Sequence, residues 1–126
     1  MAGHIISRID GRLLVMEAAN PLPQPILQGH AITTNGTIKV NMTQNDSDII
    51  LGFAFRDQAT PGGTVEVYLS GVVWVPYTGT APAVTGDSGV EASNTPGVVE
   101  APGLGAGFGT AILVDAPNNL VLLRFG

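Results

Sequence analysis

Hydrophobic and polar residues alternate along much of the chain after Gly29, which is the pattern of a β-strand with one buried face. Residues 37–42 alternate in this way, and residues 64–70 do so again. The runs at 49–55 and 72–75 are more continuously apolar. No window of about 11 residues after Gly29 carries a helical period, so the sequence predicts an all-β domain.

Residues 1–28 follow a different pattern. Prolines alternate with other residues at positions 21, 23 and 25. Because proline fixes φ near about −65° and lacks an N–H, they predict an extended, polyproline-like segment. A helical turn over residues 13–19 is also compatible with the sequence and would end at Asn20-Pro21. We predict an N-terminal arm over 1–28, either poorly ordered or ordered by a neighbouring molecule, and a β domain over 29–126.

A weak internal duplication relates residues 29–71 to residues 86–126. Each segment has two glycines with the same spacing, an acidic turn after the second glycine, and a final strand. The glycines are Gly29 and Gly52 in the first segment, and Gly86 and Gly109 in the second. One such unit cannot cover its own apolar face, so the pair predicts a small β-barrel or sandwich built from two related units.

Composition excludes several classes of protein. The 126 residues suit one domain, and only 12% are charged, with 5 basic and 10 acidic side chains. Five scattered cations give no basic surface for nucleic acid, and no run reaches the roughly 18 apolar residues of a membrane helix. The absence of cysteine excludes disulfides, thiolate zinc sites and cysteine nucleophiles. The N-terminal residues lack the apolar core of a secretion signal.

Gly86-Asp87-Ser88-Gly89 resembles the nucleophile signature of trypsin-like serine proteases. However, Val90 stands where that signature continues with glycine, and the candidate bases are His4 and His30. Asp and Ser at a glycine turn more simply hydrogen-bond to their own backbone. We therefore expect a turn and no catalytic residues, and a hydrolase using Ser88 is the third hypothesis for function.

Other motifs give no cofactor or metal site. The glycines at 103, 105, 107 and 109 recur at every second residue, which does not fit a nucleotide-binding loop and instead lets another backbone approach a strand closely. Asp46 and Asp48 are spaced like calcium ligands, but Ile49 to Leu51 follow where further ligands belong, so we expect a polar loop. We predict neither a cofactor nor a bound metal.

The order of motifs over residues 28–126 resembles that of the capsid cement, or head decoration, proteins of tailed bacteriophages. The segments that carry this resemblance are Leu51-Gly-Phe-Ala-Phe55, the acidic turn after it, Gly63 to Val75, Thr85-Gly86-Asp87, Gly109-Thr-Ala111 and the strand from Leu120 to Phe125. The resemblance implies a β-rich protein, without enzymatic activity, on the outer surface of the virion capsid. It also implies binding to the major capsid protein, capsid stabilisation and a homotrimer, with no nucleic acid or membrane partner.

Residue roles follow from exposed apolar character and not from a family motif. We expect the arm to contact the capsid through Ile5, Ile6, Arg8 and Arg12. We expect Trp74 and Tyr77, which flank Pro76, to pack at a subunit interface, where aromatic residues are enriched. The alternative function is a carbohydrate- or host-surface-binding β module such as a head fibre.

Overall fold

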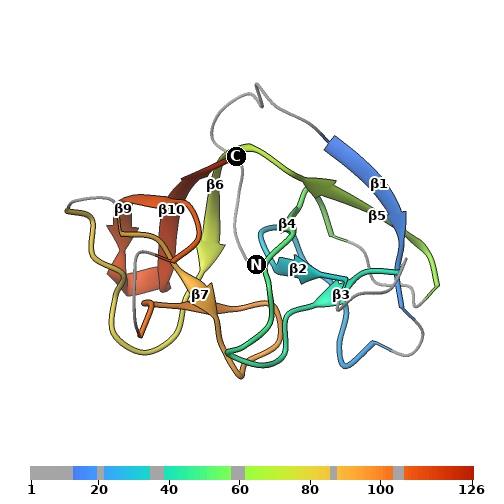
Figure 1. Cartoon of the computed structure of the whole chain (residues 1–126), viewed down its shortest axis with the longest axis horizontal. Coiled ribbons are helices and arrows are strands. Elements are labelled where there is room, and N and C mark those ends of the chain that lie inside the picture. Colours follow the sequence, from blue (N-terminus) through green and yellow to red (C-terminus); the bar gives the residue numbers. More distant parts are fainter. Residues whose placement is uncertain (1–12, 20–21, 35–38, 58–61, 86–87, 104–106) are drawn as a thin grey trace.

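The computed structural model describes residues 13–19, 22–34, 39–57, 62–85, 88–103 and 107–126. Within these residues the chain is all-β, as predicted, and is consistent with a small sandwich (Figure 1). The strands are β1 (Leu13–Glu17), β2 (Ala31–Thr33), β3 (Asn41–Met42), β4 (Gly52–Ala54), β5 (Thr64–Tyr68), β6 (Gly71–Pro76), β7 (Glu91–Ala92), β8 (Val99–Glu100), β9 (Thr110–Asp115) and β10 (Leu120–Phe125). A 3₁₀ turn over Ala116–Asn118 joins β9 to β10.

The strands form three antiparallel sheets. A five-stranded sheet has the order β1-β5-β4-β2-β3, a three-stranded sheet the order β6-β10-β9, and β7 pairs with β8. Figure 1 shows the five-stranded sheet on one side of the molecule and β6, β9 and β10 on the other. The alternating run at 64–70 forms β5 and the apolar run at 72–75 lies in β6, as predicted. Of the run at 49–55, only β4 is a strand.

The described part of the predicted arm belongs to the β domain, which corrects the predicted boundary after residue 28. Residues 13–17 form β1, which pairs with β5, so the helical turn that the sequence also allowed is not formed. Ala18 and Ile26 are buried with Val65 and Val67 in one core cluster, and Met16 packs against it. Residues 13–17 are therefore extended, because only an extended segment can pair with β5 as the edge strand of this sheet.

The two halves of the chain share one plan of strand pairing. In each half, the segment that contains the second glycine of the predicted repeat makes two backbone hydrogen bonds to the segment near the start of that repeat. The N–H groups of Leu51 and Ala54 donate to the carbonyls of Ile32 and His30, and those of Phe108 and Ala111 donate to Val90 and Ser88. The same segment then pairs with the last strand: Ala54 lies opposite Val67 in one half, and Ala111 lies opposite Leu123 in the other.

The shared plan also includes β1 and β6, which lie outside the predicted repeats. Residues 13–17 of β1 pair with residues 68–64, and residues 72–76 of β6 pair with residues 124–120. Each strand then continues into a parallel bridge, between Ala18 and Val40 in the first half and between Tyr77 and Val99 in the second. The correspondence therefore begins at β1 and β6, before the boundaries expected from the glycines.

Gly52 and Gly109 are both required because a side chain at either position would meet a backbone carbonyl. A Cβ at Gly52 would overlap the carbonyl oxygen of Tyr68, and a Cβ at Gly109 would lie 2.7 Å from the carbonyl oxygen of Arg124. Tyr68 and Arg124 occupy matching positions in β5 and β10. The two halves thus need glycine where a central strand approaches the last strand most closely.

A second core cluster joins the halves. Phe53 of β4 packs edge-on against Phe125 of β10, with ring centroids 4.9 Å apart, and against Phe108 at 5.9 Å. The cluster also contains Val73, Val75 and Leu123 from the inner face of the three-stranded sheet. Both halves therefore share one aromatic core, and this fixes which face of that sheet points away from the body of the protein.

Candidate functional site

The face of the three-stranded sheet that points away from the core is the best candidate for a functional surface. Register places its side chains in three rows across β6, β10 and β9. We call these nine residues the outer face: Val72, Arg124 and Thr110 in the first row, Trp74, Leu122 and Leu113 in the second, and Pro76, Leu120 and Asp115 in the third. Alternate residues of the same strands belong to the aromatic core.

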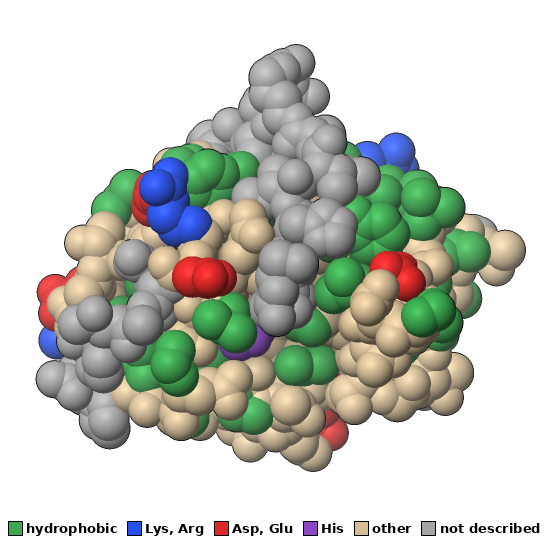
Figure 2. Space-filling model, turned by 180° about the vertical axis from the view of Figure 1, so that it is seen from behind, with side chains coloured by type: hydrophobic (Ala, Val, Ile, Leu, Met, Phe, Trp, Pro, Cys, Tyr) green, Lys and Arg blue, Asp and Glu red, His purple; other side chains and the backbone are tan. Residues whose placement is uncertain are grey.

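The outer face is apolar in its centre, although an antiparallel sheet with one solvated face normally carries polar residues there. Leu113 is 54% exposed, Trp74 is half-buried, and Leu122 is buried but lies outside both core clusters. Figure 2 shows hydrophobic side chains at the surface on both sides of the molecule, including the right side in that view, where β6, β9 and β10 lie. An apolar face of this kind is typical of a binding surface.

The first half of the chain provides an internal comparison. Val15 and Glu66 occupy the positions that Trp74 and Leu122 occupy in the second half. Glu66 accepts an ion pair from Arg56, with 2.7 Å between Nε and Oε1, so this row carries charge. The central position is thus charged in the first half and apolar in the second, whereas Val15 and Trp74 are both apolar, so the fold alone does not require an apolar residue at the position of Leu122.

Tyr77 does not contribute to this face, which corrects its predicted place at a subunit interface. The side chain is 6% exposed and belongs to the aromatic core with Val73 and Val75. β6 ends at Pro76, and Tyr77 then forms an isolated parallel bridge with Val99. Since Trp74 and Tyr77 are three residues apart, an extended chain directs them to opposite faces. The interface role of Trp74 stays a prediction that its position on the outer face supports.

The four residues expected to contact the capsid lie outside the described residues. Ile5, Ile6, Arg8 and Arg12 belong to the segment 1–12, so their role stays a prediction. His4 belongs to the same segment.

The contacts of Ser88 and His30 support structural roles. The Ser88 carbonyl accepts the Ala111 N–H at 2.8 Å, and a Cβ at Gly89 would overlap the carbonyl oxygen of Phe108, so the backbone of this segment packs closely against its neighbour. Nδ1 of His30 accepts the Leu27 N–H at 3.1 Å. Burial lowers the pKa of His30 to about 4, partly offset by the charge of Asp57. Asp87 lies outside the described residues.

The other candidate motifs also have structural roles, either hydrogen-bonding to backbone groups or allowing two backbones to pack closely. Oδ2 of Asp48 accepts the N–H groups of Gln44 and Asn45 at 2.8 and 3.1 Å, as expected for a polar loop. In the glycine-rich segment, Gly107 has a positive φ of 78° and the neighbouring Phe108 bridges to Val90, so two backbones lie side by side there. Within the described ranges, no group of three or more His, Asp or Glu side chains could hold a metal ion.

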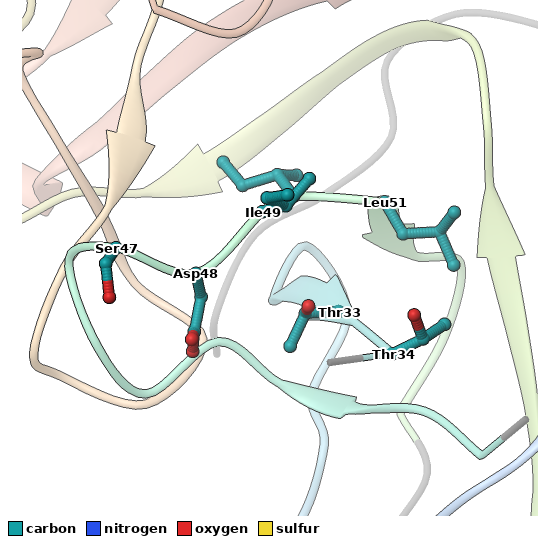
Figure 3. A pocket seen from close by; sticks show the side chains of 7 residues that line it. Thr33, Thr34, Ser47, Asp48, Ile49 and Leu51 are labelled. Carbon is teal, nitrogen blue, oxygen red and sulfur yellow. The ribbon is translucent and has the colours of Figure 1, made fainter. Parts of the chain in front are cut away.

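One pocket was not anticipated from the sequence. It has a volume of about 400 Å³ and lies between the end of β2 and the loop that leads into β4 (Figure 3). Its lining residues are Thr33, Thr34, Ser47, Asp48, Ile49, Ile50 and Leu51. Ile49 is 83% exposed, although the apolar run suggested a strand interior. The pocket offers hydroxyl groups and apolar surface but no aromatic side chain, and we assign it no ligand.

A pair of acidic residues also escaped the sequence reasoning because it forms only through pairing of β7 with β8. Glu91 lies opposite Glu100. Burial raises the pKa of Glu100, and the hydrogen bond with Glu91 and the charges of Glu91 and Asp46 raise it further. Oε1 of Glu91 accepts the Gly103 N–H at 3.1 Å. The two carboxyl groups therefore repel each other when both are charged, and the residues described around them give no indication of a ligand.

Comparison with known proteins finds no matching family model, and no curated protein matches the chain. A helix with the length and apolar character needed to cross a membrane is absent from the described segments.

Proposed function

We propose that this protein is a capsid decoration (cement) protein that binds the outer surface of the mature head of a tailed bacteriophage and stabilises it. The observation that carries the proposal is the apolar outer face, because a small, sparsely charged β body with such a face is suited to assembly with other copies of itself on a protein shell that its N-terminal segment contacts. The order of motifs along the chain supports the same function. The partner that this function requires is the major capsid protein.

The mechanism is thermodynamic. A protein that binds only the expanded shell favours that shell by mass action, by about 2.7 kcal/mol per site when free protein is at 100 times its Kd. In a homotrimer, three N-terminal segments bind the same shell, and their effective concentration raises the overall affinity without any new contact. No chemical step is needed, which agrees with the structural roles of Ser88 and His30.

Binding to heads that lack the protein tests the proposal. We expect the full chain to sediment with such heads and to raise the temperature at which they release DNA. Deleting residues 1–12 leaves β1 in place and should abolish binding without unfolding the domain. The variant Val84→Ser, at a 46% exposed residue of the loop after β6, is the matched control and should bind normally. Heads that never bind the full chain would refute the function, and a positive glycan array would then favour the carbohydrate-binding alternative.

A further inference from the structure

We propose that the outer face is the surface through which copies of this chain bind one another. Its central row consists of Trp74, Leu122 and Leu113, one residue from each strand of the sheet. A row with a tryptophan flanked by two leucines is the composition of an interface core, where aromatic residues are enriched and charges are depleted. Leu122 is already buried in the single chain, so the cost of solvation falls on Leu113, which is 54% exposed, and a partner surface that covers it removes that cost.

The β-bulge in β9 extends the apolar area. The register between β9 and β10 shifts between Leu122 and Leu123, so that Ile112 has no partner on β10. Ile112 is 36% exposed and lies next to the more exposed Leu113. A bulge turns the edge of a sheet and re-aims its side chains. Here it adds a second apolar side chain at the β9 edge, while Trp74 lies on β6 at the opposite edge.

The charges at the two ends of the outer face indicate that its partner is a second copy. Arg124 stands in the row at one end and is exposed, and Asp115 stands in the row at the other end. On β10 these rows lie four residue steps apart, from Leu120 to Arg124, which is about 13 Å along a strand. When copies are arranged head to tail around a common axis, Arg124 of one chain lies next to Asp115 of the following chain, and the apolar rows meet at the axis. One chain thus supplies both complementary ends.

A head-to-tail contact fits a closed ring. Each copy then uses its Arg124 end toward one neighbour and its Asp115 end toward the other, so every contact contains the same pair. The homotrimer of the proposed function is a ring of this kind, and that number of copies rests on the proposed function. Which face forms the contact does not rest on the proposed function, because the strand register of the three-stranded sheet defines that face.

Light scattering after size-exclusion chromatography tests the face on the full chain. We expect the native chain to form an oligomer, and Leu113→Lys to weaken its association at least about tenfold, so that the monomer predominates. Val15→Lys is the matched control, because Val15 is 60% exposed and holds the position of Trp74 in the first half. It should leave the mass unchanged. Circular dichroism and thermal melting establish that both variants are folded. A monomeric native chain, or a Leu113→Lys chain that associates normally, overturns the proposal.

Charge reversal tests the arrangement of the copies. Arg124→Asp and Asp115→Arg should each weaken association about tenfold, since each creates a like-charge contact between neighbours. The double variant restores opposite charges and should recover the native mass. A double variant no better than either single variant overturns the head-to-tail contact. The two proposals fail separately. If the native chain forms an oligomer that Leu113→Lys dissociates but does not bind heads, only the proposed function is refuted. If the chain binds heads but is always monomeric, only the interface is refuted.

Discussion

Lowering the pH from 7 to 4 is expected to destabilise this fold through the side chain of His30. The imidazole is 4% exposed, and its Nδ1 accepts the Leu27 N–H, so the folded state holds it neutral. The ring also packs against Gly97, where a Cβ would lie 2.6 Å from Cγ. Protonation at Nδ1 would break the bond to Leu27 and place a charge in this packed site, with only Asp57 to offset it.

The size of the effect follows from the pKa of His30, which is lowered from 6.5 to about 4. Below 6.5 the unfolded chain takes up a proton that the folded chain does not, so stability falls as the pH falls toward the folded pKa. The slope is about 1.4 kcal/mol per pH unit, and the total loss approaches about 3 kcal/mol at pH 4. Well above pH 6.5 this contribution to stability is fully present, and below pH 4 the loss grows only slightly before it levels off.

Urea denaturation at several pH values measures this loss, with His30→Asn as the control. The amide oxygen of asparagine can accept the Leu27 N–H but does not titrate, and the two chains share every other titratable group. We expect the native chain to lose about 3 kcal/mol more stability than His30→Asn between pH 7 and pH 4. Equal losses in the two proteins would refute the assignment of a buried neutral imidazole.

Three further predictions concern single residues, and urea denaturation measures each. Gly52→Ala should destabilise by at least about 2 kcal/mol because its Cβ overlaps a carbonyl of β5, whereas Gly103→Ala, with nothing within 4 Å, should change stability by less than about 0.5 kcal/mol. Glu100→Gln should stabilise by about 0.5 kcal/mol at pH 7 by removing the repulsion from Glu91. Because the pKa of Glu100 is raised, that gain should disappear as the pH falls and the native side chain protonates; a gain that persists in acid contradicts this cause. Phe53→Ala should cost about 3–5 kcal/mol, since its ring touches both halves, and a loss below 1 kcal/mol would contradict its central place.

Local patterns in the sequence predicted the strands whose residues alternate or stay apolar. The alternation at 64–70 gave β5, with Val65 and Val67 buried on one side. Periodicity failed at 49–51, where an apolar run forms a loop and leaves Ile49 exposed, because a short apolar run carries no period of its own. The expected interface place of Tyr77 was also wrong, because a bridge to Val99 follows β6 and its side chain packs into the aromatic core.

Long-range pairing was beyond what the sequence could show. The glycine spacing revealed the repeats because Gly52 and Gly109 meet the same backbone contact in each half. No comparable sequence feature shows that β1 and β6 are equivalent strands, and the prolines after β1 favoured the prediction of an extended arm over that of a strand. The outer face was likewise visible only through Trp74, because Leu122 and Leu113 join its row through pairing of β10 with β6 and β9. Sequence indicates which residues form strands, while register decides which side chains become neighbours.

The turn at Gly97 has a consequence for the covalent chain. Gly97 belongs to the second half, yet its N–H donates to Thr43 and its carbonyl accepts from Ala31, both of the first half. Together with the shared phenylalanine cluster, these bonds interlock the halves. The mostly exposed connection at 78–85 therefore adds little cohesion. A protease cut there should leave a nicked particle whose two fragments stay associated and, once mixed as separate peptides, reconstitute the native body.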